Sequence, residues 1–305
     1  MVTANQRKPS KWMLLAIAQS LIWFFGVPII CRKYWDALFG SMSDRVADFT
    51  ITTFTPILVI FIYNIIMLPI YYFQHPFFEQ FKIQRDRPWP WRDERENVRR
   101  AFWALSARSV KLTLINMFIL LPIMAIQKIL LIQSLGKVNP SAFRTDDESW
   151  PSMMDNSRDL ILLTVLHEFG FYSAHRLMHT FPSLYQYHKV HHEYKCNTTL
   201  GAQHNHPVDF ILSIGGPGLL TAVFINPHSS TFFQWFLWVM YANLDDHVGY
   251  SFPWSPVRWF PLSASTDEHE FHHSKNLGCF ASKLSIFNSL LGGYEQYSTH
   301  VRKSE

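Results

Sequence analysis

Residues 175–192 read HRLMHTFPSLYQYHKVHH, and five of these eighteen residues are histidines. His175 and His179 are four residues apart, so on a helix their imidazoles face the same way. A second group follows at positions i, i+3 and i+4, which predicts three more imidazoles on one helical face. The members of this second group are His188, His191 and His192.

The same spacing recurs downstream at His269, His272 and His273, and His247 lies between the groups in residues 245–250. Without a metal, these rings would bring repelling imidazolium charges or unpaired ring nitrogens together, which is costly. One metal ion takes four to six ligands, so these nine histidines predict two ions. Imidazole suits zinc, iron, copper and nickel, and the missing thiolates argue against a structural zinc site.

Two other metal motifs are excluded by their spacing. The Glu-x-x-His pattern of ferritin-like carboxylate di-iron bundles is absent. His167 and Glu168 are not followed by the second histidine that a zinc protease needs. The metal centre is therefore expected to be built mainly from imidazole.

The composition describes a chain that is apolar for its length. Of 305 residues, 48% are hydrophobic and only 16% are charged, against about 25% charged in an average soluble domain. The mean hydropathy is 0.00, so apolar runs must alternate with polar regions. A net charge of +4 is too small to argue for nucleic-acid binding. The three cysteines are widely spaced, which favours reduced thiols over a disulfide scaffold.

Four apolar runs are expected to span a membrane, because a hydrocarbon core of about 30 Å needs roughly 20 helical residues. The first follows three cations and has no cleavage site, so we interpret it as a retained signal anchor. Two weaker runs, 210–225 and 231–244, favour half-helices or an interfacial hairpin. The four expected spans are residues 12–31, 50–73, 112–132 and 159–174.

The charges of the loops predict an orientation. Residues 74–111 carry nine Lys or Arg, whereas residues 133–156 carry two. Because Lys and Arg stay on the cytoplasmic side, the first loop is expected in the cytosol and the second in the lumen. Everything after residue 174 then lies in the cytosol. The loop of residues 31–49 carries three cations and fits its lumenal assignment less well.

These observations predict an all-α membrane protein, a helical bundle of about four spans with a cytosolic histidine-rich helical cap. Residues 1–158 would form an anchor region with three spans. Residues 159–300 would form the catalytic region, with the fourth span and the cap, and residues 301–305 a short tail.

Two smaller motifs receive ordinary interpretations. Trp89 and Trp91 alternate with prolines just after a span, which is typical of an anchor at the headgroup level or of a plain turn. Asn197 begins a glycosylation sequence, Asn-Thr-Thr, but in this topology it faces the cytosol and is expected to stay unmodified.

The ordered histidine motifs resemble the membrane-bound fatty acid hydroxylase superfamily, and within it the sterol branch. The resemblance runs from about Glu168 to about Tyr297, with a weaker similarity in residues 81–84. Its His-x3-His, His-x2-His-His, His-Gly-Tyr-type and final His-x2-His-His elements are matched here in order. The matching residues are His175, His179, His188, His191, His192, His247, His269, His272 and His273.

This resemblance implies a non-haem di-iron oxygenase of the endoplasmic reticulum membrane, with its site on the cytosolic face. It implies two iron ions held by the nine histidines, with O2 and with electrons from NAD(P)H through cytochrome b5 or a reductase. Residues 202–207 are similar to an element of C4-methylsterol oxidases, but they depart from it at Gln203 and His204. Residues 245–254 are closer to cholesterol 25-hydroxylases and sphingoid-base hydroxylases.

Several neighbouring residues are candidates for supporting roles. His206 is a possible tenth ligand or a hydrogen-bonding residue, and His204 is expected to lie just outside the ligands. Carboxylates commonly accept the second ring N–H of a liganding histidine. Those expected to do so here, with surface or capping roles as the alternative, are Glu168, Asp209, Asp245 and Asp246.

The leading hypothesis is therefore an iron-dependent lipid hydroxylase, acting on a sterol in the manner of a C4-methylsterol monooxygenase. Hydroxylation of a sterol side chain, or of a sphingoid base or fatty acid, remains an alternative. A non-catalytic membrane scaffold with the same fold is a hypothesis of another class, although none of the nine histidines is missing. A metal transporter would need polar groups within its spans, and Lys128 is almost alone there.

Overall fold

The computed structural model describes residues 12–137, 150–259 and 262–304. Within these residues the fold is all-helical, as predicted, and extended pairing is limited to two isolated β-bridges. The N-terminal cations at positions 7, 8 and 11, residues 138–149 of the loop 133–156 and the last residue lie outside the described residues.

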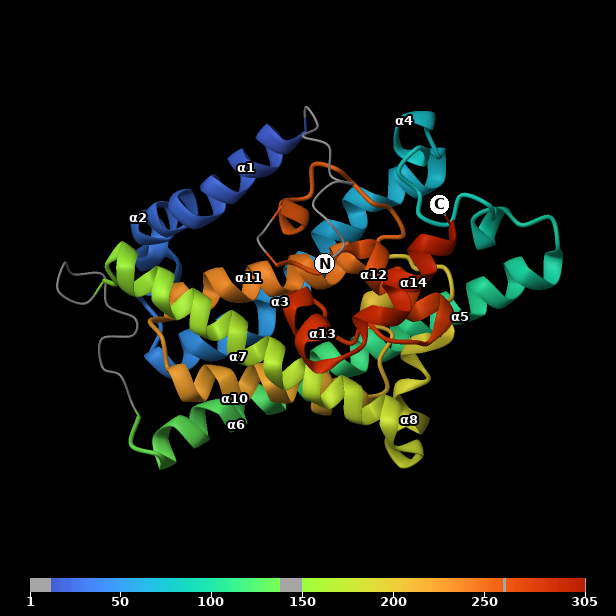
Figure 1. Ribbon diagram of the computed structural model, residues 1–305. Coiled ribbons are helices and arrows are strands. Elements are labelled where there is room, and N and C mark those ends of the chain that lie inside the picture. The colour runs from blue at the N-terminus through green and yellow to red at the C-terminus, as the bar shows by residue number, and fades with distance from the viewer. Residues whose placement is uncertain (1–11, 138–149, 260–261, 305) are drawn as a thin grey trace.

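Long helices form a bundle in which the chain runs repeatedly between two ends (Figure 1). The first rod joins α1 (Met13–Leu21), the π-helix η2 (Ile22–Gly26) and α2 (Val27–Phe39), and α3 (Asp44–Phe73) follows it. A second rod joins α5 (Glu96–Ile115), η4 (Asn116–Leu120) and α6 (Leu121–Ser134). The others are α7 (Met153–Thr180), η7 (Phe210–Gly215) with α10 (Gly216–Ile225), and α11 (Ser229–Asp246).

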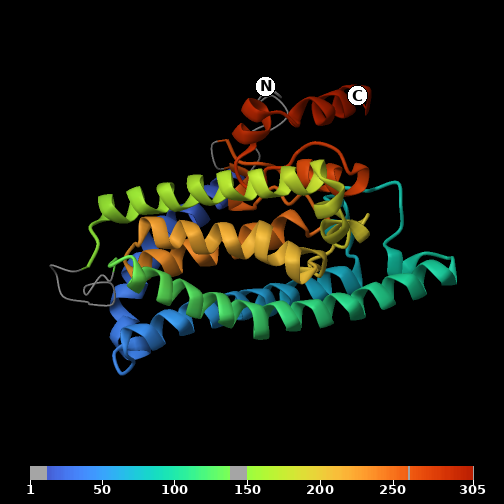
Figure 2. The same ribbon diagram turned by 90° about the horizontal axis from the view of Figure 1, so that it is seen from below.

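Helix α11 is the central element of the bundle. Most of its residues are buried, and it packs against α3, α7 and α2. In the second view α10 and α11 lie between α7 on one side and the rod α5–α6 with α3 on the other (Figure 2). Aromatic residues that include Trp35 of α2 and Trp235 of α11 fill one part of the interior.

The outer faces of the helices are apolar. Large hydrophobic side chains such as Phe61, Phe73 and Phe224 are mostly exposed. A soluble protein rarely exposes apolar surface on this scale, so these faces are suited to contact lipid tails. Four helices are long and apolar enough to cross a membrane, which indicates a multi-pass membrane protein. They are Met13–Phe39, Asp44–Phe73, Glu96–Ser134 and Pro207–Ile225.

The fourth of these helices differs from the one expected. Residues 159–174 lie in α7, which does not qualify by composition, whereas residues 207–225 do qualify. The reason lies in how α7 is used: its polar residues, such as His167 and Glu168, are buried inside the bundle, while Ile161 and Phe169 point outward. Average hydropathy does not register this division. The assignment of residues 159–174 as a span, like the division at residue 158, stays a prediction.

The short elements gather mainly at one end of the bundle. They are α4 (Pro76–Glu79), η3 (Pro90–Arg92), α8 (Pro182–His188), η5 (His191–Glu193), η6 (Gly201–Gln203), α9 (Pro207–Asp209), η8 (Pro256–Trp259), α12 (Thr266–Lys275), α13 (Ser285–Leu291) and α14 (Tyr294–Ser304). The basic segment after α3 is attached at this end, because Ile83 N donates to Gly249 O (3.1 Å) and Ser251 N to Phe81 O (2.7 Å). The basic loop and the histidine-rich segments therefore share one end of the bundle.

Two residues that the sequence motifs singled out, Trp89 and Asn197, are buried next to this contact. Trp89 is only 1% exposed and packs below Gly249, whose φ of +72° suits glycine. A Cβ at Gly249 would lie 2.5 Å from the Asn197 carbonyl oxygen. Trp89 is thus a core residue, and its interpretation as a headgroup anchor is wrong. The Asn197 side chain is fully buried.

Candidate metal centre

The nine histidines of the sequence motifs lie together at this end of the bundle and form two adjacent groups. The five-histidine cluster contains His175, His179, His188, His192 and His272. The four-histidine cluster contains His191, His247, His269 and His273. Within each group, one ring nitrogen from every residue lies within 4.8 Å of those of all the others.

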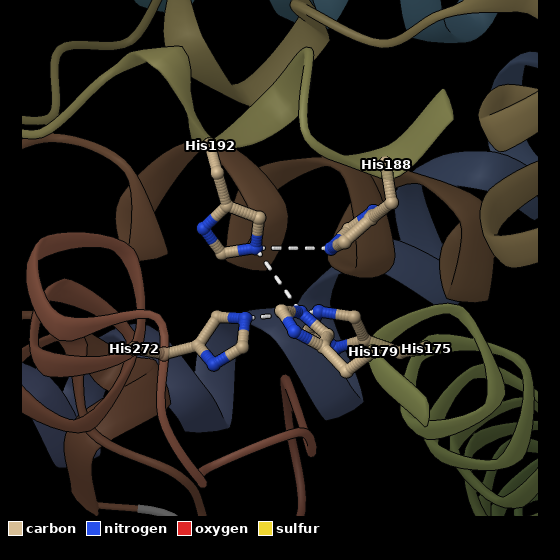
Figure 3. A group of neighbouring side chains, drawn as sticks. All are labelled: His175, His179, His188, His192 and His272. Atoms are coloured by element: carbon tan, nitrogen blue, oxygen red, sulfur yellow. Dashed lines mark hydrogen bonds between the residues drawn. The ribbon is translucent and has the colours of Figure 1, made fainter. Parts of the chain in front are cut away.

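The five-histidine cluster combines three parts of the chain around one shared space (Figure 3). His175 and His179 come from the last turns of α7, and His272 comes from α12. The remaining two come from the segment that follows α7, where α8 ends at His188 and η5 includes His192. The expected helical presentation of the first pair is confirmed.

The second motif does not lie on one continuous helix. A turn at Lys189 and Val190 separates α8 from the 3-10 helix η5. His188 and His192 enter the five-histidine cluster, whereas His191 enters the other. The prediction that all three converge from one helical face is therefore wrong, although all three reach the centre.

The third motif lies on α12, as its spacing predicts, but it also serves both clusters. His269 and His273 face the four-histidine cluster, while His272 faces the other one. Successive residues on an α-helix are about 100° apart, so i+3 and i+4 point in clearly different directions. Each His-x2-His-His motif consequently sends its first and third histidines to one cluster and its second to the other.

The distances within the clusters match those between ligands of one ion. His192 Nε2 lies 3.0 Å from His188 Nε2 and 3.1 Å from His179 Nε2. In the other cluster, His247 Nε2 lies 2.9 Å from His269 Nε2 and 3.2 Å from His191 Nε2. Two nitrogens bound to an ion at about 2.1 Å, at right angles, stand about 3.0 Å apart.

Hydrogen bonds at the other ring nitrogen explain why Nε2 faces inward. The Nδ1 atom of His175 lies 2.7 Å from Phe280 O, that of His272 2.6 Å from Gly278 O, and that of His247 2.7 Å from Asn243 O. A carbonyl can only accept, so each Nδ1 carries the proton and each Nε2 keeps a free lone pair.

Electrostatics also keeps these rings neutral. Burial, reinforced by the nearby His247, holds the pKa of His191 and of His269 well below its ordinary value. Burial does the same for the pKa of His273, and the neighbouring His191 and His269 add to it. Neutral imidazoles with converging lone pairs repel one another unless a cation lies between them, so these residues fit a bound metal ion.

The predicted supporting carboxylates occupy different positions. Asp209 Oδ2 lies 3.1 Å from His188 Nδ1, in the place expected for a carboxylate that orients a liganding histidine. Glu168 Oε1 instead accepts from the backbone N–H groups of Ser282 (2.7 Å) and Lys283 (2.9 Å). Asp246 accepts from Ser282 Oγ (3.0 Å). Glu168 and Asp246 therefore support the segment that supplies the carbonyls of Gly278 and Phe280.

The last carboxylate and the two extra histidines lie outside the clusters. Asp245 binds the hydroxyls of Tyr63 (3.1 Å) and Ser255 (2.8 Å). His206 caps α9, where its Nδ1 accepts from Val208 N. His204 bridges Ser109 Oγ (2.9 Å) and Glu193 Oε2 (3.0 Å), and burial lowers its pKa to about 4. A tenth ligand from His206 is thus not part of either group in this structure.

Sequence reasoning missed the backbone carbonyls that hold the rings. The segment of residues 278–283 has no motif of its own, and its carbonyls are directed by tertiary contacts. Cys279 has a positive φ of 49°, and its N–H donates to Gly293 O. Gly278 and Cys279 both adopt the αL conformation, which helps to direct these carbonyls. The sequence of this stretch does not predict that conformation.

Comparisons with known proteins agree with this site. Residues 160–293 match the model of the fatty acid hydroxylase family. Methylsterol monooxygenase 1 of Rattus norvegicus is 26% identical over 269 residues, which are 86% of this chain and 84% of that protein. A methylsterol monooxygenase of Aspergillus fumigatus is 29% identical over 146 residues, 47% of this chain and 49% of the relative.

A relative of another activity is about as similar. A very-long-chain aldehyde decarbonylase of Oryza sativa subsp. indica is 34% identical over 137 residues, 44% of this chain and 51% of the relative. The chain spans about half the length of this relative and of the Aspergillus protein. No solved structure gives a significant match.

Residues 160–293, which match the fatty acid hydroxylase family model, contain all nine clustered histidines. The methylsterol monooxygenases among the relatives of this chain are consistent with the sterol branch of the superfamily. The two histidine clusters are groups that could each hold a metal ion.

Proposed function

We propose that this protein is a non-haem di-iron oxygenase that hydroxylates a membrane lipid, using O2 and electrons derived from NAD(P)H. The observation that carries the proposal is the convergence of nine imidazoles into two groups at one end of an apolar-faced bundle. One iron would be held by the five-histidine cluster and the other by the four-histidine cluster. Bound iron would supply the activation of O2 that attack on an unreactive C–H bond requires.

The residues of the chain prepare this site in three ways. The carbonyls of Asn243, Gly278 and Phe280 hold three rings in the required tautomer. Asp209 adds negative charge behind His188, which strengthens that imidazole as a ligand. Eight of the nine rings are buried, so bulk water is kept from the centre.

The relatives favour a sterol substrate. Proteins named methylsterol monooxygenase align with the chain over up to 86% of its length, so oxidation of a C4-methyl group is the leading reaction. The decarbonylases among the relatives are similar only over about half of their length, and they leave room for a long-chain substrate. A lipid held in the bilayer would meet the centre at the end of the bundle.

The position of the basic loop supports a cytosolic site in the endoplasmic reticulum membrane. Residues 74–111 carry nine cations and contact the histidine-rich end through Gly249 and Ser251. Positive loops stay in the cytosol, so the centre would face the cytosol. Cytochrome b5 or a reductase on that side would then deliver the electrons.

A second candidate reaction is oxidation far from the polar group of the lipid, as in hydroxylation of a sterol side chain. It is favoured by residues 245–254, which are closer to cholesterol 25-hydroxylases than to C4-methylsterol oxidases.

The test combines metal analysis with lipid profiling. Detergent-purified protein should contain about two irons per chain, and a preparation freed of metal should be inactive. Cells lacking the protein should accumulate 4-methylsterols if the leading reaction is right, or lose an oxysterol if the second candidate is right. A metal-free preparation that retains activity would overturn the proposal, and an altered pool of fatty acids or sphingoid bases alone would refute a sterol substrate.

A further inference from the structure

Lys283 is buried but has few partners. It is 5% exposed, and among the described residues its ammonium group makes one hydrogen bond, to Ser282 Oγ (3.0 Å), and no ion pair. By contrast, the equally buried Lys128 bonds both Asp48 Oδ1 (2.8 Å) and Thr52 Oγ1 (2.8 Å). An ammonium group has three N–H donors, and leaving such donors buried without partners is costly. A ligand beside Lys283 can therefore supply what the protein does not.

The space for such a ligand is a cavity of about 270 Å³ that Lys283 lines. It lies between η2, α7, α11 and the segment that contains Lys283. Its wall is mainly apolar, with Trp23, Leu160 and Trp238 among the lining residues. An apolar cavity of about 150 Å³ holds one benzene ring. This cavity is therefore large enough for the polar end of a lipid and about two rings, or a chain of similar size.

The two ends of the cavity differ in their surroundings. Ile161 and Val165 line it and are 63% and 41% exposed, so the cavity reaches the apolar outer face of α7. Lys283 marks the other end, because its Nζ lies 5.4 Å from the centre of the Phe171 ring. Phe171 follows Val165 by six residues on α7, a rise of about 9 Å toward the histidine clusters. A lipid that enters from the bilayer thus meets Lys283 at the cluster end.

The ammonium group of Lys283 is close to both clusters. The centre of the Phe171 ring lies 5.2 Å from that of His175, which belongs to the five-histidine cluster. The hydroxyl that accepts from Lys283 also donates to Asp246 Oδ2 (3.0 Å), and Asp246 directly precedes His247 of the four-histidine cluster. Burial lowers the pKa of His247 to about 4, and the positive charge of Lys283 contributes to this shift. Few side chains therefore separate this end of the cavity from the metal centre.

The charges around Lys283 favour an uncharged ligand. Glu168 Oε1 accepts from the backbone N–H of Lys283 (2.9 Å), and Asp246 is joined to the ammonium group through one hydroxyl. A ligand with a negative charge of its own would meet these two carboxyl groups. The remaining N–H groups of an ammonium only donate, so they suit the oxygen of a hydroxyl or of a carbonyl.

We propose that Lys283 binds the hydroxyl or carbonyl oxygen of an uncharged membrane lipid, whose hydrocarbon body lies in this cavity and extends past Ile161 and Val165 into the bilayer. Each part of the lipid then meets a surface of its own polarity. The oxygen receives the unused donors of Lys283, and the hydrocarbon contacts the apolar wall. The part that the cavity does not hold stays among the lipid tails.

The arrangement has a consequence for the position that is oxidised, and this part rests on the proposed oxygenase function. Because Lys283 lies at the cluster end of the cavity, the carbons next to the oxygen are the part of the lipid closest to the histidines. A C4-methyl carbon is only three bonds from the sterol hydroxyl, whereas the sterol side chain would point toward the bilayer. The site therefore favours the leading reaction over the second candidate.

The experiment measures binding by full-length protein in nanodiscs, without an electron donor and thus without turnover. The probes are a 4-methylsterol, its 3-ketone, its 3-sulfate ester and the matching hydrocarbon without oxygen. The alcohol or the ketone should bind about tenfold more tightly than both the hydrocarbon and the sulfate ester. Comparing the alcohol with the ketone tells which oxygen Lys283 prefers.

Four variants separate the contribution of Lys283 from that of the cavity. Lys283→Met should erase the preference over the hydrocarbon, and Lys283→Arg should retain part of it. Val165→Trp narrows the cavity and should weaken the binding of the alcohol and of the hydrocarbon alike. Thr164→Val is the control, because the Thr164 hydroxyl belongs to the same wall but already bonds Leu160 O (2.8 Å). It should leave the preference unchanged.

Three outcomes would overturn the proposal: equal binding of all four probes by the unmodified protein, a preference that survives Lys283→Met, or tightest binding of the sulfate ester. If Lys283→Met does not fold, Val165→Trp decides, since unchanged binding of the alcohol by that variant would also exclude the cavity. A clear preference in a protein that lacks iron or activity would refute the proposed function and leave this site standing. Loss of the preference in an active, iron-containing protein would refute the site alone.

Discussion

The two histidine clusters use the same sequence motifs but are held in different ways. In the five-histidine cluster, three of the five rings are tied at Nδ1, to Phe280 O, Asp209 and Gly278 O. In the four-histidine cluster, only His247 is tied, whereas the Nδ1 atoms of His191, His269 and His273 are buried without a partner in the described part of the chain.

In the five-histidine cluster, protein hydrogen bonds fix the orientation of most rings. In the four-histidine cluster, ring orientation depends more on the bound metal. Hydrogen bonds behind the ligands fix ring orientation and raise affinity. The five-histidine cluster is therefore expected to keep its geometry when empty, and the four-histidine cluster to lose its metal more readily.

Replacing His191 and His192 together by Ala removes one ligand from each cluster. We expect turnover to fall at least about a thousandfold and the iron content to drop well below two per chain, because no cluster stays complete. The protein should remain in the membrane, since the apolar faces of the bundle are unchanged. Activity assays, metal analysis and membrane fractionation provide the measurements. The exposed neighbour Lys189 serves as a matched control, and Lys189→Ala should behave like the unmodified protein.

The adjacent residues His272 and His273 offer a sharper comparison because they belong to different clusters. His273→Ala leaves three ligands in the less supported cluster, and we expect it to retain about one iron. His272→Ala leaves four ligands in the better supported cluster and should retain more metal than His273→Ala. Both should lose activity about a hundredfold or more.

His206→Ala is the matched control for this pair, since His206 lies outside both groups. It should keep both irons. Equal metal loss in His272→Ala and His273→Ala would show that the two clusters do not differ in metal affinity. Metal loss in His206→Ala would show that His206 is a tenth ligand.

Asp209→Asn tests the charge behind a single ligand. The amide keeps the shape of the side chain but not its negative charge, so His188 becomes a weaker ligand. We expect the metal affinity of the five-histidine cluster, or the activity, to fall about 10- to 100-fold. Metal titration of the variant measures this change, with Asp86→Asn at an exposed position as the control. An unchanged affinity would show that the carbonyl contacts suffice.

The smallest expected effect is kinetic. A chelator added to the loaded protein should remove the metal of the four-histidine cluster several-fold faster than that of the other, because its rings lack hydrogen bonds behind them. Stopped-flow chelation in the unmodified protein should then give two phases, and His273→Ala should lack the faster one. A single phase in the unmodified protein would contradict the expected order.

Much of the candidate site could be predicted from the sequence because ligand spacing is a local property. His175 and His179 lie on one helix, and His269, His272 and His273 on another, as the intervals of three and four residues require. The all-helical class and the presence of several apolar helices also follow from composition. These properties depend on neighbours within two helical turns.

Other features could not be predicted because they depend on distant segments. The polar face of α7 is buried, so average hydropathy does not register that its outer face is apolar. Trp89 resembles a headgroup anchor until the segment after α3 is placed against Gly249. The supporting contacts of Glu168 reach residues more than a hundred positions away.

The sequence by itself determined which residues converge: an apolar chain with nine histidines at helical spacing has to bury these rings together and satisfy them. Only the tertiary structure decided how the rings divide. Helical periodicity states that i+3 and i+4 point about 100° apart, but not what lies in either direction. Tertiary packing brings the first and third histidines of each motif into one cluster and the second into the other.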